Sequence, residues 1–315
     1  KESNYGRGIS SRNSEVIHSG IYYPINTLKS KYCIKGREQI YDYCKVNNIY
    51  HKQCGKIIIA RKEQKQELQA LMDLGHHNQI NSIKWLTKKN ISELEPFVEG
   101  DFGLYIPETG IIDSHGLMNS FYNESVNINH DYLFKSELIG CSKINRGYEI
   151  HLKTPATSTE IVTCDWVINA SGLNSDLIAQ KIMDNQITPS LVYSKGYYFS
   201  LNNKWHNKFS HLIYPIPDKN QHSLGIHISF DQKGYVKLGP DVHFLKNRNE
   251  DYSMDESLLH IFYKAALQYI PNLNIDDLSP NYSGIRPKIN SKGYTFQDFY
   301  IQHEIKNGFP RLINL

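Results

Sequence analysis

The most informative stretch of the chain is residues 10–23, which read Ser-Ser-Arg-Asn-Ser-Glu-Val-Ile-His-Ser-Gly-Ile-Tyr-Tyr. Gly6 and Gly8 precede it, and Gly20 lies inside it. Because glycine frees the backbone and the short polar side chains donate hydrogen bonds, the stretch is typical of a phosphate or cofactor contact rather than of a core. A capped helix start with a surface histidine is the alternative that local chemistry leaves open.

The composition is that of an ordinary globular chain with room for two domains: 315 residues, of which 40% are hydrophobic and 21% charged. The 35 basic and 32 acidic residues leave a net charge of +3. The densest basic run, 61–65, is interrupted by Glu63 and indicates a solvated helix face. We therefore expect no nucleic-acid partner.

The cysteines and the hydropathy pattern indicate the cellular compartment of the protein. The 5 cysteines are odd in number and lie far apart, so we expect neither a disulfide framework nor a metal site, and a reducing environment follows. No stretch approaches the roughly 18 apolar residues of a membrane span. We expect a cytoplasmic protein, with peripheral attachment to the inner membrane as an open alternative.

Hydrophobic periodicity and turn residues predict alternating helices and strands. Helices are expected over 35–47 and 62–75, within 78–96 together with a short turn, from an N-cap at Asp113 to about 126, from about 174, and over 256–270. Strands are expected over 57–59, as a hairpin within 139–154 that turns at 145–147, over 164–170, and as several short strands within 191–245.

The order of these elements predicts the fold class. Pieces of α/β type are separated by a helical segment and then by an antiparallel block, which predicts two interleaved domains. The apolar strand 164–170 runs directly into Ser171 and Gly172, a geometry in which backbone approaches a flat cofactor closely. An ordinary turn between strand and helix is the alternative.

A resemblance to a known family rests on blocks spread along the chain. Besides residues 10–23 they are Cys54–Ala60, Thr109–Ser114, Val167–Leu173, Leu238–Val242, Tyr282–Pro287 and Leu312–Leu315. In this order they resemble the L-2-hydroxyglutarate dehydrogenase/oxidase family, a branch of the FAD-dependent oxidoreductases related to D-amino-acid oxidase.

The resemblance implies an α/β (mixed α+β) fold that combines a Rossmann-like FAD-binding domain with a substrate domain on a mixed, largely antiparallel sheet. The FAD-binding domain is expected in 1–48, 111–185 and 279–315, and the substrate domain in 49–110 and 186–278. It further implies that the chain starts after the family's Gly-x-Gly-x-x-Gly turn and stops before a second flavin loop. We therefore expect an incomplete FAD-binding domain that by itself holds FAD poorly.

The activity that the resemblance implies is oxidation of L-2-hydroxyglutarate to 2-oxoglutarate by hydride transfer to FAD, with electrons passing to a quinone or oxygen. Other small-molecule substrates of the same superfamily stay open: glycerol 3-phosphate, malate or an amino acid. An inactive fragment is the alternative from a different class.

Oxidation of a 2-hydroxy acid needs a cation for the carboxylate and a base for the hydroxyl proton. Arg286, which follows Gly284-Ile285 and precedes Pro287, is the candidate cation, because its guanidinium binds a carboxylate in bidentate fashion. A structural pair with Asp298 is its alternative. His18 is the candidate base, since an unperturbed imidazole has its pKa near the working pH. A structural histidine is the alternative there.

The remaining candidates follow the family pattern by position. FAD contacts are assigned to Glu2, Ser11, Arg12, Asn13, Ser14 and Gly172. The acid for the adenosine ribose is Glu2 or a residue before Lys1. Weaker candidates for the substrate pocket, beside Arg286, are Tyr282, Tyr198 and Lys195; packing or surface positions are their alternatives.

Overall fold

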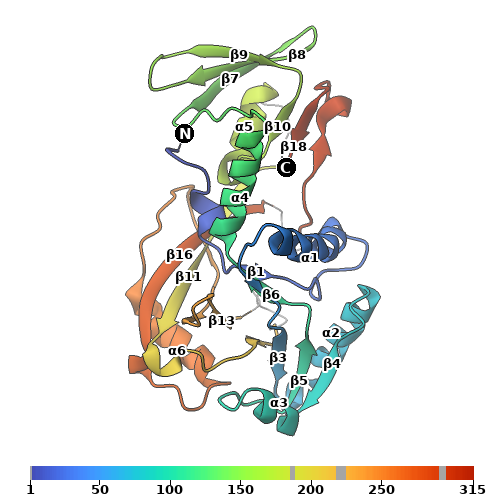
Figure 1. Cartoon of the computed structure of the whole chain (residues 1–315), viewed down its shortest axis with the longest axis vertical. Helices are drawn as coiled ribbons and strands as arrows, with labels where there is room; N and C mark the ends of the chain where they lie inside the picture. Colours follow the sequence, from blue (N-terminus) through green and yellow to red (C-terminus); the bar gives the residue numbers. More distant parts are fainter. Residues whose placement is uncertain (1, 185–188, 218–224, 291–295) are drawn as a thin grey trace.

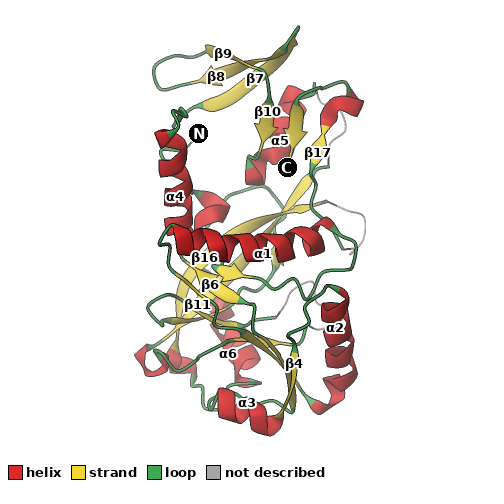
Figure 2. Cartoon of the chain, turned by 45° about the vertical axis from the view of Figure 1, so that its right-hand side comes forward, coloured by secondary structure: helices red, strands yellow, loops and turns green. Residues whose placement is uncertain are grey.

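The computed structural model describes residues 2–184, 189–217, 225–290 and 296–315. A large sheet and its covering helices form one end of the molecule, and two smaller sheets with α4 and α5 form the other (Figure 1). Helix α1 (Leu28–Val46) crosses between the two ends (Figure 2).

The large sheet is the frame on which the site is built. Its strand order is β15 (His243–Phe244), β11 (Leu191–Leu201), β14 (Val236–Leu238), β13 (Ile228–Phe230), β12 (Leu212–Pro215), β3 (Lys56–Ala60), β5 (Phe102–Ile106) and β4 (Lys84–Thr87), with β16 (Leu278–Ile289) paired to β11. Among its described pairs only β12 with β3 is parallel. The prediction of a mixed, largely antiparallel sheet is confirmed.

The two faces of this sheet differ in chemistry, because side chains alternate along each strand. Ile213, Ile228 and Leu238 lie on the apolar face. On that side the ring of Phe199 packs 4.6 Å from that of Phe262 in α6 (Leu259–Leu267). The opposite face carries lysines, tyrosines and a histidine from the same strands, and this face forms the site described below.

Three small sheets complete the fold of the described residues. They are β1 (Val16–Ile17), β6 (Gly110–Ile112) and β2 (His51–Lys52); β10 (Val167–Asn169), β18 (Leu312–Asn314) and β17 (Gln302–His303); and β7 (Glu137–Ile144), β8 (Gly147–Lys153) and β9 (Glu160–Cys164). The pairing of β10 with β18 is parallel. Helix α5 (Ser175–Ile182) begins directly after β10 and a short turn of 3-10 helix.

Several local predictions are confirmed. The hairpin turns before Gly147, and Asp113 caps α4 (Ser114–Asn127) by accepting a hydrogen bond from the Gly116 N–H at 2.9 Å. Helix α2 (Lys65–His77) falls close to its expected place. Helix α1 begins earlier than expected, because Asp298 accepts the N–H groups of Leu28 and Lys29 at 2.6 and 2.8 Å.

Two local predictions are wrong in part. Within 78–96, where a helix and a short turn are expected, the helix is limited to α3 (Lys88–Leu94), since residues 84–87 pair with β5 as strand β4. The expected buried strand over 164–170 shrinks to β10, and its Ile168 is 62% exposed. A three-stranded sheet with an open side leaves apolar side chains in water, which a continuous apolar run does not reveal.

The expected domain boundary before residue 279 coincides with the start of a strand of the large sheet. Strand β16 pairs with β11 from Leu278 to Ile289. We propose that the boundary lies after Ile289, so that β16 belongs with the substrate domain.

Candidate functional site

Residues 8–14 form a loop that is held by hydrogen bonds from its own short side chains. In the 3-10 helix η1 (Gly8–Ser11), the Ser11 hydroxyl donates to the carbonyl of Gly8 at 3.2 Å. The Asn13 amide donates to the carbonyl of Ser10 at 2.8 Å. These side chains shape the loop through bonds to its own backbone.

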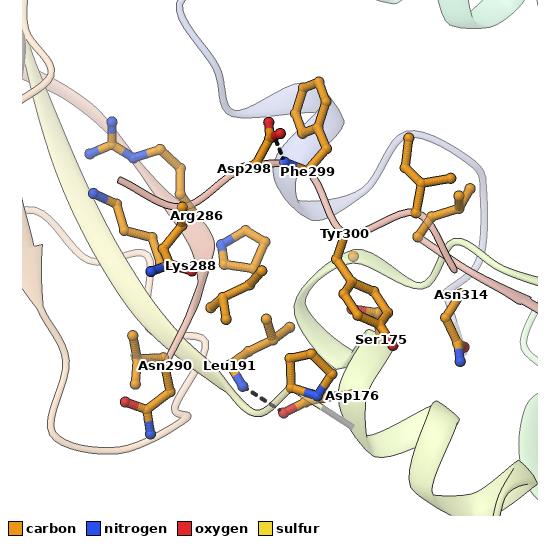
Figure 3. Close-up of a pocket in the computed structure, with 18 of the residues that line it drawn as sticks. Ser175, Asp176, Leu191, Arg286, Lys288, Asn290, Asp298, Phe299, Tyr300 and Asn314 are labelled. Carbon is orange, nitrogen blue, oxygen red and sulfur yellow. Dashed lines mark hydrogen bonds between the residues drawn. The ribbon is translucent and has the colours of Figure 1, made fainter. Parts of the chain in front are cut away.

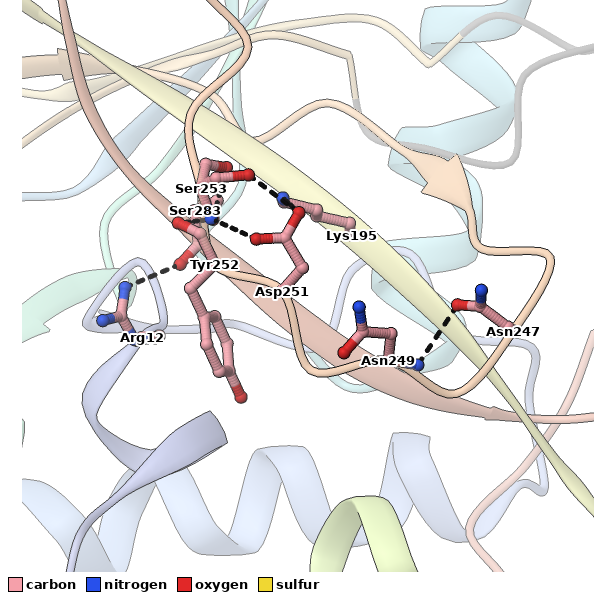
Figure 4. A network of polar contacts seen from close by, with 8 residues as sticks. All are labelled: Arg12, Lys195, Asn247, Asn249, Asp251, Tyr252, Ser253 and Ser283. Carbon is pink, nitrogen blue, oxygen red and sulfur yellow. Dashed lines mark hydrogen bonds and ion pairs between the residues drawn. The ribbon is translucent and has the colours of Figure 1, made fainter.

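Arg12 fastens this loop to the edge of β16. Its Nη1 donates to the carbonyl of Ser283 at 3.2 Å, and its guanidinium lies 4.4 Å from the centre of the Tyr252 ring (Figure 4). Gly284 permits the contact, because a Cβ there would collide with the Arg12 carbonyl oxygen. The loop therefore lies directly on the large sheet.

A cavity of about 1320 Å³ opens beside this loop. Arg286 and Lys288 of β16 lie on one side of it, while Ser175 of α5 and Asn314 of β18 lie on the other (Figure 3). Strands β10 and β18 run parallel, so their carboxyl ends share an edge, and ligands of α/β sheets bind at that edge.

Gly172 lines the cavity just after the end of β10. Its φ of +60° is in the left-handed region, and a Cβ there would stand 3.3 Å from Cδ1 of Ile9 in η1. A side chain at this position would be strained and crowded. The glycine therefore lets cavity and loop lie close together.

Arg286 connects the cavity to the polar face of the sheet. Its Nη2 donates to the carbonyl oxygen of Asp241 at 2.8 Å, and burial lowers the pKa of its guanidinium. The alternative of a pair with Asp298 is wrong in this structure, because Asp298 caps α1.

Two of the candidate pocket residues meet beside Arg286. The rings of Tyr198 and Tyr282 are stacked with centroids 4.3 Å apart. The Tyr282 hydroxyl donates to the Asn13 carbonyl at 2.7 Å, and the Ser14 hydroxyl bonds to Tyr198. The structure thus brings the loop and both tyrosines together.

His18 follows β1 and is half-buried. Burial, and secondarily the charge of Lys56, lower the pKa of His18 to about 4. The expectation of a pKa near the working pH is therefore not met. The imidazole is neutral at pH 7 and available to accept a proton.

Two candidates lie away from this group. Lys195 is on the opposite face of β11 from Tyr198 and Arg286, and its Nζ pairs with Asp251 at 3.4 Å (Figure 4). Alternation along the strand explains this placement. Glu2 is exposed and is not among the residues that line the cavity.

Sequence reasoning missed a group of buried polar side chains on the same face of the large sheet. Lys56 of β3, Tyr214 of β12 and His227 beside β13 are 1%, 0% and 4% exposed. Each has a side-chain polar atom with no hydrogen-bond partner among the described residues. The available signal was a lysine directly before the apolar run 57–59.

Comparison with known proteins identifies the class. The DAO family, described as FAD dependent oxidoreductase, matches residues 1–314, so the chain belongs to this family of FAD-dependent enzymes. The mitochondrial L-2-hydroxyglutarate dehydrogenase of Arabidopsis thaliana is 33% identical over 350 residues, which cover 99% of this chain and 72% of that protein. The L-2-hydroxyglutarate dehydrogenase of Indibacter alkaliphilus is 31% identical over 81% of this chain and 63% of its own length.

Solved structures confirm the fold. The dithionite-reduced L-alpha-glycerophosphate oxidase of Mycoplasma pneumoniae, with FAD bound, superposes with a TM-score of 0.87 at 23% identity and covers 100% of this chain and 81% of its own. Glycine oxidase of Geobacillus kaustophilus gives a TM-score of 0.74 at 16% identity, over 92% of this chain and 75% of its own.

The residues present fit the FAD of this family. The cavity exceeds the roughly 1,000 Å³ that bounds most small-molecule sites, so it has room for part of a dinucleotide. Gly172 has no side chain to fill it.

Within the described ranges, no helix is both long and apolar enough to cross a membrane.

Proposed function

We propose that the chain oxidises L-2-hydroxyglutarate to 2-oxoglutarate. The observation that carries the proposal is the position of Arg286, which lies at the cavity and on the same sheet face as the Tyr198 and Tyr282 pair. The relatives named L-2-hydroxyglutarate dehydrogenase support this choice of substrate.

Bound FAD supplies the acceptor for the hydride that leaves C2 of the substrate. Arg286 binds the carboxylate next to C2, since a guanidinium pairs with both oxygens of a carboxylate. A ring nitrogen of His18 accepts the hydroxyl proton while the C2–O double bond forms. One hydride and one proton thus leave the substrate, and 2-oxoglutarate remains.

The contacts support a division of roles among the cofactor candidates. We place Gly172 against the cofactor, because it lines the cavity without a side chain. Ser11, Arg12 and Asn13 hold the loop through their bonds to backbone carbonyls. Ser14 positions Tyr198. A role for Glu2 at the adenosine ribose stays a prediction without support from its contacts.

The acceptor of the electrons is proposed to be a quinone or oxygen. Assays of quinone reduction and oxygen consumption on one preparation distinguish the two. A cytoplasmic location, with peripheral attachment to the inner membrane as the alternative, also stays a proposal; fractionation of cell lysates tests it.

Anaerobic bleaching of the flavin absorbance by candidate substrates tests the proposed function. L-2-hydroxyglutarate is expected to bleach FAD-loaded protein, and its D enantiomer, malate, amino acids and glycerol 3-phosphate are expected to act far more slowly. Faster bleaching by glycerol 3-phosphate would replace the proposed substrate. Flavin that no substrate bleaches would favour the inactive alternative.

A further inference from the structure

Lys56, the first residue of β3, is a buried lysine. Only 1% of the residue is exposed, and its Nζ has no hydrogen-bond partner among the described residues. The ammonium lies between two aromatic rings, 4.4 Å from the centre of Tyr22 and 4.9 Å from that of Tyr214. No carboxylate of the described chain forms an ion pair with it.

The two tyrosines add unused donors at the same place. The hydroxyl oxygens of Tyr22 and Tyr214 are also buried and lack a hydrogen-bond partner among the described residues. The ring of His227 stacks on Tyr214 with centroids 3.9 Å apart and faces the Gly225 carbonyl at 3.1 Å through Nδ1. The ring contact holds Tyr214 in position.

Such an arrangement is costly for a fold that has no ligand to bind. Contacts with two aromatic faces offset only part of the hydration free energy that an ammonium loses on burial. Two phenol hydroxyls without partners add a further desolvation cost. A methionine at position 56 would fill similar space without the cost of the buried ammonium, so the arrangement indicates a place kept for an anion.

Strand register places this site and Arg286 on the same face of the large sheet. Lys56, Tyr214 and His227 share this face. Burial, with smaller contributions from the charges of His18, Lys56 and Arg286, lowers the pKa of His227 to about 3. Two separate cations, Lys56 and Arg286, therefore lie on one face of the sheet. A substrate with two carboxylates matches them, whereas a monocarboxylate leaves one cation unpaired.

We propose that Lys56 and the hydroxyls of Tyr22 and Tyr214 bind the second carboxylate of the substrate, the one remote from C2. An ammonium and two phenols can all donate, and a carboxylate is an acceptor only. Lys56 is then the residue that selects a dicarboxylic over a monocarboxylic 2-hydroxy acid. This inference rests on the proposed function, in which Arg286 holds the first carboxylate.

Lys56→Met in FAD-loaded protein tests the inference with two substrates. L-2-hydroxypentanoate is a matched probe, because it carries a methyl group where L-2-hydroxyglutarate carries the remote carboxylate. The variant is expected to lose about 30-fold or more in kcat/KM for L-2-hydroxyglutarate, mainly through KM, and less than about 3-fold for L-2-hydroxypentanoate. Lys84→Met, at an exposed position of β4, is the matched control and should leave both values unchanged.

Thermal unfolding gives a second readout. Removal of an unpaired buried cation should raise the Tm of Lys56→Met above that of the unmutated protein, whereas loss of a structural lysine would lower it. The product 2-oxoglutarate should raise the Tm of the unmutated protein more than that of the variant.

The outcomes separate this inference from the proposed function. Equal losses for both substrates, or a loss confined to kcat, would overturn the role of Lys56 while leaving L-2-hydroxyglutarate as substrate. If the unmutated protein oxidises glycerol 3-phosphate and not L-2-hydroxyglutarate, the proposed function fails, and this inference fails with it.

Discussion

Gly196 lies against the guanidinium of Arg286: a Cβ on Gly196 would stand 2.9 Å from Nη2 of Arg286. The same Cβ would be 2.9 Å from the carbonyl oxygen of Asp241, the acceptor of the Arg286 hydrogen bond. A residue without a side chain therefore gives the arginine the space in which it meets its partner.

Gly196→Ala should displace Arg286 without removing it. The added methyl group crowds the guanidinium, so we expect kcat/KM for L-2-hydroxyglutarate to fall by about 10-fold or more, the scale of one weakened charge-assisted hydrogen bond. Steady-state kinetics on FAD-loaded protein measure the effect. Gly36→Ala is the matched control, since no atom of the described residues lies within 4 Å of a Cβ at Gly36. Equal kinetics for the two variants would contradict the packing argument.

Arg286→Lys keeps the charge and loses the two-pronged geometry. We expect it to weaken kcat/KM for L-2-hydroxyglutarate by about 2 kcal/mol or more, roughly 30-fold, with the flavin spectrum nearly unaltered. Unchanged kinetics would rule out Arg286 as the carboxylate ligand. A lost flavin spectrum would instead assign the arginine to the cofactor.

Part of the site could be predicted because its residues lie in short, distinctive blocks. The structure brings His18, Ser14, Tyr198, Tyr282 and Arg286 to one region, although they lie far apart in the sequence. Their mutual placement depends on long-range strand pairing, which a single sequence does not determine.

Each prediction that failed has an identifiable physical cause. Lys195 was grouped with Tyr198 although the two residues are three apart, and side chains three apart on a strand point to opposite faces. Lys56 was missed because burial of a charged side chain depends on neighbours from β12 and from Tyr22. The early start of α1 depends on Asp298, far away in the sequence.

His18→Ala tests the proton acceptor. Loss of a general base commonly costs about 100-fold or more, so anaerobic reduction of the flavin by L-2-hydroxyglutarate should slow by that factor while FAD stays bound. Stopped-flow absorbance measures this rate directly. His77→Ala, on the exposed end of α2, is a control with an expected wild-type rate. Reduction at the wild-type rate in His18→Ala would leave His18 a structural role only.

The pH dependence of kcat/KM tests both titrating groups at once, because kcat/KM reports the pKa values of the free enzyme. His18 must be deprotonated to accept a proton, and its pKa is lowered to about 4, so activity should fall as the pH drops through about 4. Lys56 must be protonated to bind a carboxylate. Burial lowers its pKa to about 7, so activity should also fall as the pH rises through about 7.

If Lys56 binds the carboxylate, the fall in kcat/KM as the pH rises through about 7, the upper limb of the profile, reports the titration of Lys56 alone. The titratable groups described around it are Cys33, Tyr22, Tyr214, His18 and His227. Burial raises the pKa of the thiol and of both phenols and lowers that of both imidazoles, so none of these groups acquires a charge near pH 7. Lys56→Met should therefore abolish the upper limb and leave the acid limb near pH 4. In the pH profile of kcat for the unmutated protein, the upper limb should move above pH 7, because a bound carboxylate stabilises the ammonium of Lys56. An upper limb that survives in Lys56→Met would assign the titration to another group.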